Sequence, residues 1–167
     1  MTSNTIIHIR NFTVLALVQV LIFSQIHLFG YATASIYLIF LLKLPRHTSR
    51  NEQILWGFLF GLTVDIFCNT PGINAAAATA MGFIRGTILN IFTPKAMADD
   101  FTPDAKTLKW GGYIVYSAMN IAIFYTILFF IELFTVRYPG TLLLGIVSST
   151  ILTMLFVIVI ESFSRNR

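Results

Sequence analysis

Long apolar runs separated by short polar segments dominate the hydropathy pattern of this chain. Polar and apolar residues do not alternate within the runs, so the pattern differs from that of barrel strands. A segment in lipid must satisfy its backbone polar groups internally, and a helix does so by itself. The pattern therefore predicts an all-α protein with six transmembrane helices, at residues 9–29, 31–44, 54–68, 74–92, 104–135 and 141–162.

Two of the predicted helices, 31–44 and 54–68, are short for a membrane span. A helix perpendicular to the bilayer needs ~20 residues to cross it. We therefore expect these two helices to be broken, re-entrant or shielded from lipid by their neighbours.

The prolines support these boundaries, because all five lie in the predicted connections, where a missing N–H does least harm. Thr102-Pro103-Asp104 has the features of a helix start, with Thr102 as N-cap and proline in the first turn. The fifth helix is therefore expected to begin here, at the membrane surface, and to enter lipid near Trp110.

The composition agrees with a membrane protein, because 56% of the residues are hydrophobic and only 11% are charged. Soluble domains carry about 25% charged residues. We expect one polytopic membrane domain over residues 1–167, and we attribute the net charge of +4 to cytoplasmic loops, not to a nucleic-acid partner. The single cysteine, Cys68, excludes an internal disulfide and a multi-cysteine metal site.

The distribution of basic residues predicts the orientation. With six spans and a cytoplasmic N-terminus, only Arg137 lies outside and Arg85 lies within a span. Cytoplasmic loops are enriched in lysine and arginine, so both termini are expected in the cytoplasm. The inner side then carries Arg10, Lys43, Arg46, Arg50, Lys95, Lys106, Lys109, Arg165 and Arg167.

The longest predicted loop runs from Thr93 to Lys109 and carries the sequence ADDFTPDAK. Two interpretations are open. The loop is either a solvated connection or a cytoplasmic contact surface for a soluble or filamentous partner.

Small residues recur on one face of the third predicted helix. Gly57, Gly61 and Asp65 are four residues apart, so they share a face. Gly-x-x-x-Gly patterns allow the backbones of membrane helices to approach closely. The fourth helix has a similar stripe, and a short turn joins the two, so we expect a close-packed antiparallel pair. The second stripe consists of Asn74, Ala78, Gly82, Gly86 and Asn90.

Asp65 is an acid within an apolar run. A carboxylate at the centre of a membrane span costs about 2.5–3.5 kcal/mol, so its presence needs a reason. Three roles are open: a structural one, bonding to neighbouring helices or capping the turn; a partner-binding or conformational one; and a proton or ion relay.

Arg85 is the one basic residue predicted deep within a span. Such a residue needs a counter-charge, water or carbonyl oxygens. Asp65 and Glu132 are the candidate acids for an ion pair, and a structural arginine that bonds to carbonyls or snorkels is the simpler interpretation.

The sequence lacks the motifs of zinc proteases, of serine hydrolases and of nucleotide-binding loops. Histidines and cysteines are too few for a metal site. We therefore expect a non-enzymatic protein that holds no metal and no cofactor.

The segment GFLFGLTVDIFCNTPGINAAA, together with a short preceding span that ends in LKLPR, resembles the bacterial rod shape-determining protein MreD family. The marks of the resemblance are a glycine-rich helix that reaches an aspartate, a short turn, and a glycine before the next helix. In this chain they are Gly57, Gly61, Asp65 and Gly72.

The resemblance implies a non-enzymatic scaffold of the cell-elongation complex in the bacterial inner membrane. It implies binding to the bitopic protein MreC, and coupling of the actin-like filament MreB to RodA and its class B penicillin-binding transpeptidase. It also implies a helical arrangement similar to the substrate-binding subunits of energy-coupling-factor transporters. On this interpretation, Asp65 fixes a shape that the transmembrane helix of a partner recognises.

A small-molecule-binding or transport subunit is the alternative function. It predicts a pocket that opens outward and is lined by polar and aromatic side chains. The candidates for that lining are Gln25, His27, Tyr31 and Asn74.

Overall fold

A computed structural model of the chain describes residue 19 and residues 34–93, 101–132 and 139–165. All regular secondary structure in these residues is helical, which confirms the predicted class. The helices are α2 (Leu38–Leu42), α3 (Arg50–Cys68), α4 (Ile73–Phe92), α5 (Lys109–Glu132) and α6 (Pro139–Arg165).

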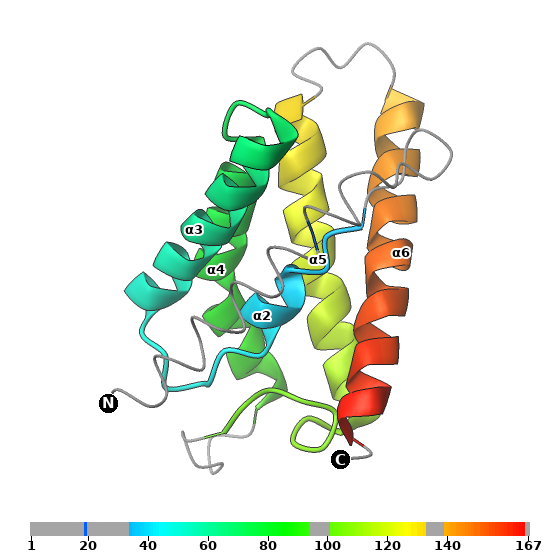
Figure 1. Ribbon diagram of the computed structural model, residues 1–167. Coiled ribbons are helices and arrows are strands. Elements are labelled where there is room, and N and C mark those ends of the chain that lie inside the picture. Colours follow the sequence, from blue (N-terminus) through cyan, green and yellow to red (C-terminus); the bar gives the residue numbers. More distant parts are fainter. Residues whose placement is uncertain (1–18, 20–33, 94–100, 133–138, 166–167) are drawn as a thin grey trace.

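The four long helices lie side by side, and α2 crosses the middle of the bundle (Figure 1). Along the chain, α3 packs on α4, α4 on α5 and α5 on α6, while α2 touches α3, α4 and α5. Helices α3 and α5 begin, and α4 and α6 end, at the lower end in Figure 1. We call this the basic end, because it carries Lys43, Arg46, Arg50, Lys106 and Lys109.

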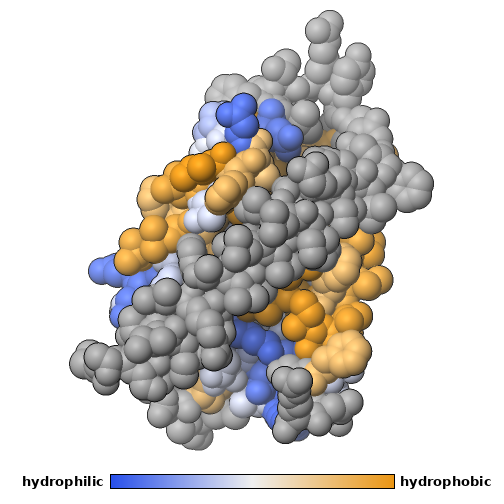
Figure 2. Space-filling view, viewed as in Figure 1, coloured by the Kyte–Doolittle hydropathy of each residue, from blue (hydrophilic) through white to orange (hydrophobic). Residues whose placement is uncertain are grey.

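Three of the described helical segments are long and apolar enough to cross a membrane, namely Ile73–Phe92, Lys109–Glu132 and Leu142–Phe163. Many large apolar side chains on the bundle surface are exposed, including Ile66 (69%) and Phe163 (74%). Figure 2 shows apolar residues between more hydrophilic groups near the ends of the helices. These features are those of a membrane protein.

The predicted third and fourth helices correspond closely to α3 and α4. Helix α3 begins earlier than predicted, at Arg50, because Ser49 and Glu52 form a capping box. The Ser49 amide donates to Glu52 Oε2 (3.0 Å), and the Glu52 amide donates to Ser49 Oγ (3.3 Å). Because its first turn is polar, α3 has a shorter apolar stretch than α4, α5 and α6.

The predicted start of the fifth helix at Thr102–Asp104 is wrong, because α5 begins at Lys109. Asp104 Oδ1 instead accepts from the amides of Lys106 (2.9 Å) and Thr107 (2.7 Å), closing a separate turn. Such local bonds compete with helix formation. Lys109 has a φ of 58°, which also separates this turn from α5. The predicted end at residue 135 lies outside the described residues, and α6 extends beyond the predicted 141–162 at both ends.

The predicted helix 31–44 is also wrong in its extent, because only Leu38–Leu42 is helical in its described part. Residues 34–36 are not helical, yet they are buried in the bundle. Of the three alternatives for this segment, its described part shows two, since the helix is broken and the neighbouring helices bury it.

Side chains from distant parts of the chain satisfy the backbone of residues 34–36. Gln19 donates to Ala34 O (2.9 Å) and accepts from the Ile36 amide (2.8 Å). The Ser35 amide donates to Tyr125 Oη (3.0 Å) and Thr153 Oγ1 (3.3 Å). Irregular backbone is tolerated at membrane depth only when protein groups or water satisfy it, so these side chains replace the hydrogen bonds of a helix.

The first predicted span, 9–29, lies outside the described residues apart from Gln19. The six-span arrangement and the cytoplasmic location of both termini therefore stay predictions. The position of the described basic residues agrees with that orientation, since all except Arg85 lie at or near the basic end.

Candidate functional site

Three glycines form the contact between α3 and α4. A Cβ on Gly57 would lie 2.9 Å from the Ala78 carbonyl carbon, and one on Gly61 would lie 2.6 Å from the Ala75 nitrogen. A Cβ on Gly82 would lie 2.5 Å from Gln53 O. All the obstructing atoms are backbone atoms, so only glycine allows this approach. The predicted close-packed antiparallel pair is confirmed.

The other two glycines of the predicted site have different roles. A Cβ on Gly86 would meet the Gln53 side chain at an ordinary 3.6 Å, so Gly86 is not part of the backbone contact. Gly72 has a φ of 80°, a left-handed conformation that suits glycine, and it is the N-cap residue of α4.

Asp65 joins the end of α3 to the start of α4. Its side chain is buried (3% exposed) and accepts hydrogen bonds from four donors. Oδ1 accepts from Thr70 Oγ1, from the Asn74 amide (3.0 Å) and from Asn74 Nδ2 (3.0 Å). Oδ2 accepts from the Ala75 amide (2.8 Å).

This geometry makes Asp65 the N-terminal cap of α4. The amides of Asn74 and Ala75 lie in the first turn, where they have no acceptor within the helix. A side-chain oxygen of the N-cap residue usually accepts them, but here that residue is Gly72, which has none. The Asp65 carboxylate takes this role from α3 and places a negative charge at the positive end of the α4 dipole. The structural role of Asp65 is therefore present in the geometry.

Among the residues that the structure describes, Arg85 pairs with backbone carbonyls and with no acid. It is fully buried, and Nη2 donates to Leu42 O (3.1 Å) and to Leu44 O. Tyr116 Oη donates to the same Leu42 oxygen (3.2 Å). Leu42 is the last residue of α2, at the end where the helix dipole favours a cation, and Leu44 lies two residues beyond it. Arg85 makes no ion pair with Asp65 or Glu132 in the described residues, so the carbonyl-bonding interpretation is confirmed.

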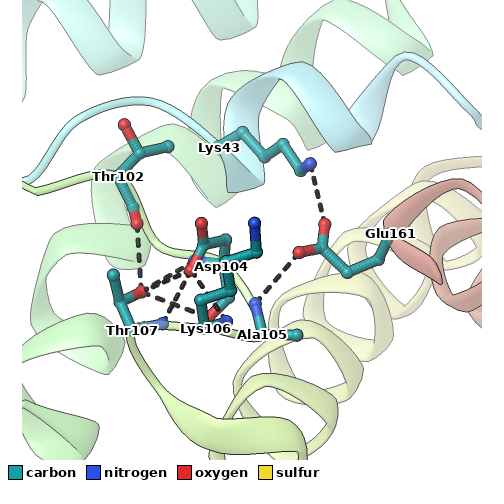
Figure 3. Close-up of polar contacts among 7 residues, drawn as sticks. All are labelled: Lys43, Thr102, Asp104, Ala105, Lys106, Thr107 and Glu161. Carbon is teal, nitrogen blue, oxygen red and sulfur yellow. Dashed lines mark hydrogen bonds and ion pairs between the residues drawn. The ribbon is translucent and has the colours of Figure 1, made fainter. Parts of the chain in front are cut away.

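A second polar cluster lies at the basic end and centres on Glu161 of α6 (Figure 3). Glu161 Oε2 is 2.7 Å from Lys43 Nζ, and Oε1 accepts from the Ala105 amide (3.0 Å). The buried carboxylate thus connects α6 to the end of α2 and to the turn before α5. Glu161 is not among the site residues predicted from the sequence. An acid near the C-terminus of an apolar helix, where the dipole disfavours it, was the available signal.

The described part of the predicted loop Thr93–Lys109 packs on the bundle. Ala105 and Leu108 are buried, and the Arg46 amide donates to Phe101 O (2.9 Å). Residues 101–108 are therefore a docked turn and not a solvated connection, while residues 94–100 lie outside the described residues. The contact-surface interpretation of this loop stays open.

An apolar groove of about 550 Å³ runs along the outside of the α3–α4 pair. We call it the hairpin groove. Small side chains of α4 form its floor, and Phe58 and Phe83 are exposed beside them. Its lining includes Ile54, Phe58, Leu62, Ala76, Thr79, Ala80 and Phe83.

The predicted ligand-binding residues are only partly described. Gln25, His27 and Tyr31 lie outside the described residues, and the Asn74 side chain bonds to Asp65. A small cavity of about 300 Å³ lies at the α3–α4 turn, beside Asp65 and Thr70. In the described ranges, no three histidine, cysteine, aspartate or glutamate side chains come together as metal ligands would.

The fold and this site define an all-helical membrane protein with a tightly packed hairpin that one buried carboxylate closes. No family model, curated protein or solved structure matches the chain.

Proposed function

We propose that this protein is a non-enzymatic scaffold of the bacterial cell-elongation complex and that its α3–α4 hairpin binds the transmembrane helix of MreC. It is a multi-pass protein of the inner membrane in this proposal, with both termini in the cytoplasm. The observation that carries the proposal is the combination of a hairpin fixed by Asp65 with an apolar groove along its outer face.

The hairpin groove has a surface suited to a helix. Association of helices in lipid lacks a hydrophobic driving force, so it depends on close packing over small residues. Ala76, Thr79 and Ala80 leave room for a second backbone, and Phe58 and Phe83 provide apolar contact beside it. The Thr79 hydroxyl donates to Ala75 O (2.6 Å) within α4, so the floor of the groove needs no polar partner.

Asp65 maintains the shape of this groove. Because its carboxylate holds the first turn of α4 against the last turn of α3, it sets the register of the two helices that form the groove. Gly57 and Gly61 set their separation. A protein that only positions partners needs such a defined surface and needs no reacting groups.

The two ends of the bundle would serve different partners. In the proposed orientation, the docked turn 101–108 faces the cytoplasm, where it would contact MreB. The Asp65 end faces the periplasm, on the side of RodA and the class B penicillin-binding transpeptidase. Coupling would follow from holding MreC between them, without a chemical step.

Filling the groove tests the proposal. Thr79→Leu should reduce the capture of MreC from membranes about tenfold, because an overpacked interface loses about 1–3 kcal/mol. Thr126→Leu is the matched control, since Thr126 also donates to a carbonyl of its own helix but is exposed on α5, outside the groove. Equal capture by Thr79→Leu and Thr126→Leu, at equal protein levels, would refute groove binding.

The alternative, a small-molecule-binding or transport subunit, has less support. Of the four residues predicted to line its pocket, only Asn74 is described, and the Asn74 side-chain amide donates to Asp65 Oδ1. Native mass spectrometry of the purified protein separates the two functions, because a metabolite retained at stoichiometric level would favour the alternative.

A further inference from the structure

Three buried oxygens at the basic end of the bundle lack hydrogen-bond donors or acceptors. Tyr113 Oη and Ser117 Oγ, one turn apart on α5, are fully buried and have no hydrogen-bond partner among the described residues. Glu161 Oε2 forms the ion pair with Lys43, but in the same part of the chain it accepts no hydrogen bond of normal geometry. Buried polar atoms in proteins are almost always satisfied, so these three require a further partner. We call them the oxygen cluster.

The members of the oxygen cluster lie close to one another. The Tyr113 hydroxyl interacts electrostatically with both Glu161 and Ser117, although it forms a well-aligned hydrogen bond with neither. Helices α5 and α6 pack on each other, and Tyr113 lies near the start of α5 while Glu161 lies near the end of α6. Both residues are therefore about 6 Å from the same end of the bundle, at a rise of ~1.5 Å per residue. Polar groups that approach without a direct hydrogen bond are often bridged by water.

Tyr116 shows that burial on α5 does not by itself leave a tyrosine hydroxyl without a partner. Its side chain is fully buried like that of Tyr113, but Tyr116 Oη donates to Leu42 O (3.2 Å). The protein thus satisfies one of these two tyrosines directly. Tyr113 differs because its nearest polar groups are members of the oxygen cluster.

The chemistry of the oxygen cluster identifies its occupant. Hydroxyl groups donate and accept, whereas a carboxylate only accepts, so the occupant must donate to Glu161 and accept from a hydroxyl. Lys43 Nζ already lies 2.7 Å from Glu161 Oε2 and would repel a second cation, while the carboxylate would repel an anion. A small neutral donor and acceptor remains, which is water. A buried water molecule typically makes about three hydrogen bonds, and the cluster offers three oxygens.

We infer that a buried water molecule binds between Tyr113 Oη, Ser117 Oγ and Glu161 Oε2. The two hydroxyls donate to the water, and the water donates to the carboxylate. This bond holds Oε2, so that Oε1 stays directed at the Ala105 amide (3.0 Å; Figure 3). Tyr113 and Ser117 are thereby positioning residues for the docked turn 101–108. The oxygen cluster shares no residue with the lining of the hairpin groove, so the inference does not depend on the proposed function.

Radiolytic labelling of the purified full chain tests for the water. X-rays convert bound water into hydroxyl radicals, which oxidise the side chains that touch it. Tyr113 should therefore be labelled several times faster than Tyr116, although both side chains are fully buried. Equal labelling of the two tyrosines would overturn the proposal. Labelling of Tyr113 that falls when sodium replaces choline in the buffer would assign the cluster to a cation and would also overturn the water.

Ser117→Ala tests the position of the water and its effect on the turn. Loss of one hydrogen bond of about 1 kcal/mol should accelerate amide hydrogen exchange at Ala105 about fivefold. It should also lower the labelling of Tyr113. Ser148→Ala is the matched control, because Ser148 Oγ donates to Leu144 O (2.6 Å) on α6, outside the cluster, and it should change neither measurement.

The sign of the Ser117→Ala effect separates a hydrated cluster from a dry one. Removing a buried hydroxyl that has no partner is neutral or stabilising, so in a dry cluster exchange at Ala105 would stay unchanged or become slower. That result would refute the inference, as would equal effects of Ser117→Ala and Ser148→Ala.

Discussion

The buried charges Asp65 and Arg85 lie on the paired helices α3 and α4, but the protein accommodates them in different ways. Four donors at sequence separations of ten residues or fewer surround the Asp65 carboxylate. Arg85 uses one nitrogen to reach carbonyls more than forty residues away, and its Nε and Nη1 have no partner among the described residues. The acid is satisfied within one hairpin, whereas the base depends on the assembled bundle.

This difference indicates which part of the molecule has a shape that local contacts fix. The hairpin contains both the glycine contact and its own cap, so its shape follows from the consecutive residues of α3, the turn and α4. Arg85 instead holds the end of α2 in place, next to Tyr116. A surface that a partner must recognise is expected to lie on the locally fixed part, and this is where the hairpin groove lies.

The largest effect should follow from placing a methyl group in the glycine contact. Gly61→Ala should reduce the free energy of unfolding by about 3 kcal/mol, because the obstructing atoms are the backbone of Asn74 and Ala75, which cannot move aside. Gly111→Ala is the control, since nothing lies within 4 Å of its added Cβ. Unfolding in detergent or bicelles measures both variants, and a stable Gly61→Ala protein would disprove the close contact.

Neutralising the acid should have the next largest effect. Asp65→Asn keeps the shape but loses charge-assisted hydrogen bonds, so we expect about 2 kcal/mol of destabilisation. Amide hydrogen exchange should accelerate at Asn74 and Ala75, which lose their cap.

The functional effect of Asp65→Asn is measured by the capture of MreC from membranes. Undiminished capture at normal protein level, with unchanged exchange at these two amides, would remove the proposed link between the cap and the groove. Faster exchange with undiminished capture would keep the cap but separate it from partner binding.

Removing the base should have the smallest of the three effects. Arg85→Met loses the hydrogen bonds to Leu42 O and Leu44 O. It also removes a buried cation whose Nε and Nη1 have no hydrogen-bond partner among the described residues. These terms oppose each other, so we expect a loss of about 1 kcal/mol in the free energy of unfolding. A cost above that of Asp65→Asn would reverse the comparison and make Arg85 the principal anchor of the bundle.

Local patterns predicted the hairpin well. The spacing of Gly57 and Gly61 predicted the contact with α4, and the turn residues predicted where α3 ends and α4 begins. The structural role considered for Asp65 has its geometry in the four donors around the carboxylate. These features depend on neighbours within a few helical turns, and sequence spacing reports such neighbours directly.

The polar contacts inside the bundle could not be predicted from local sequence patterns. An apolar run at 31–44 predicted a helix, but Gln19, Tyr125 and Thr153 supply the bonds that let residues 34–36 stay nonhelical. The same holds for Glu161, whose partners Lys43 and Ala105 come from two distant segments. No local pattern records which polar side chains will meet across a bundle.

The all-helical membrane class and the glycine packing of α3 on α4 follow from the amino-acid sequence alone, because hydropathy and helical spacing act locally. The assembled bundle was needed to show that Asp65 caps α4, that Arg85 binds carbonyls, and that α5 begins at Lys109. In lipid each buried polar group must find a partner inside the protein, and the choice among possible partners depends on which helices become neighbours.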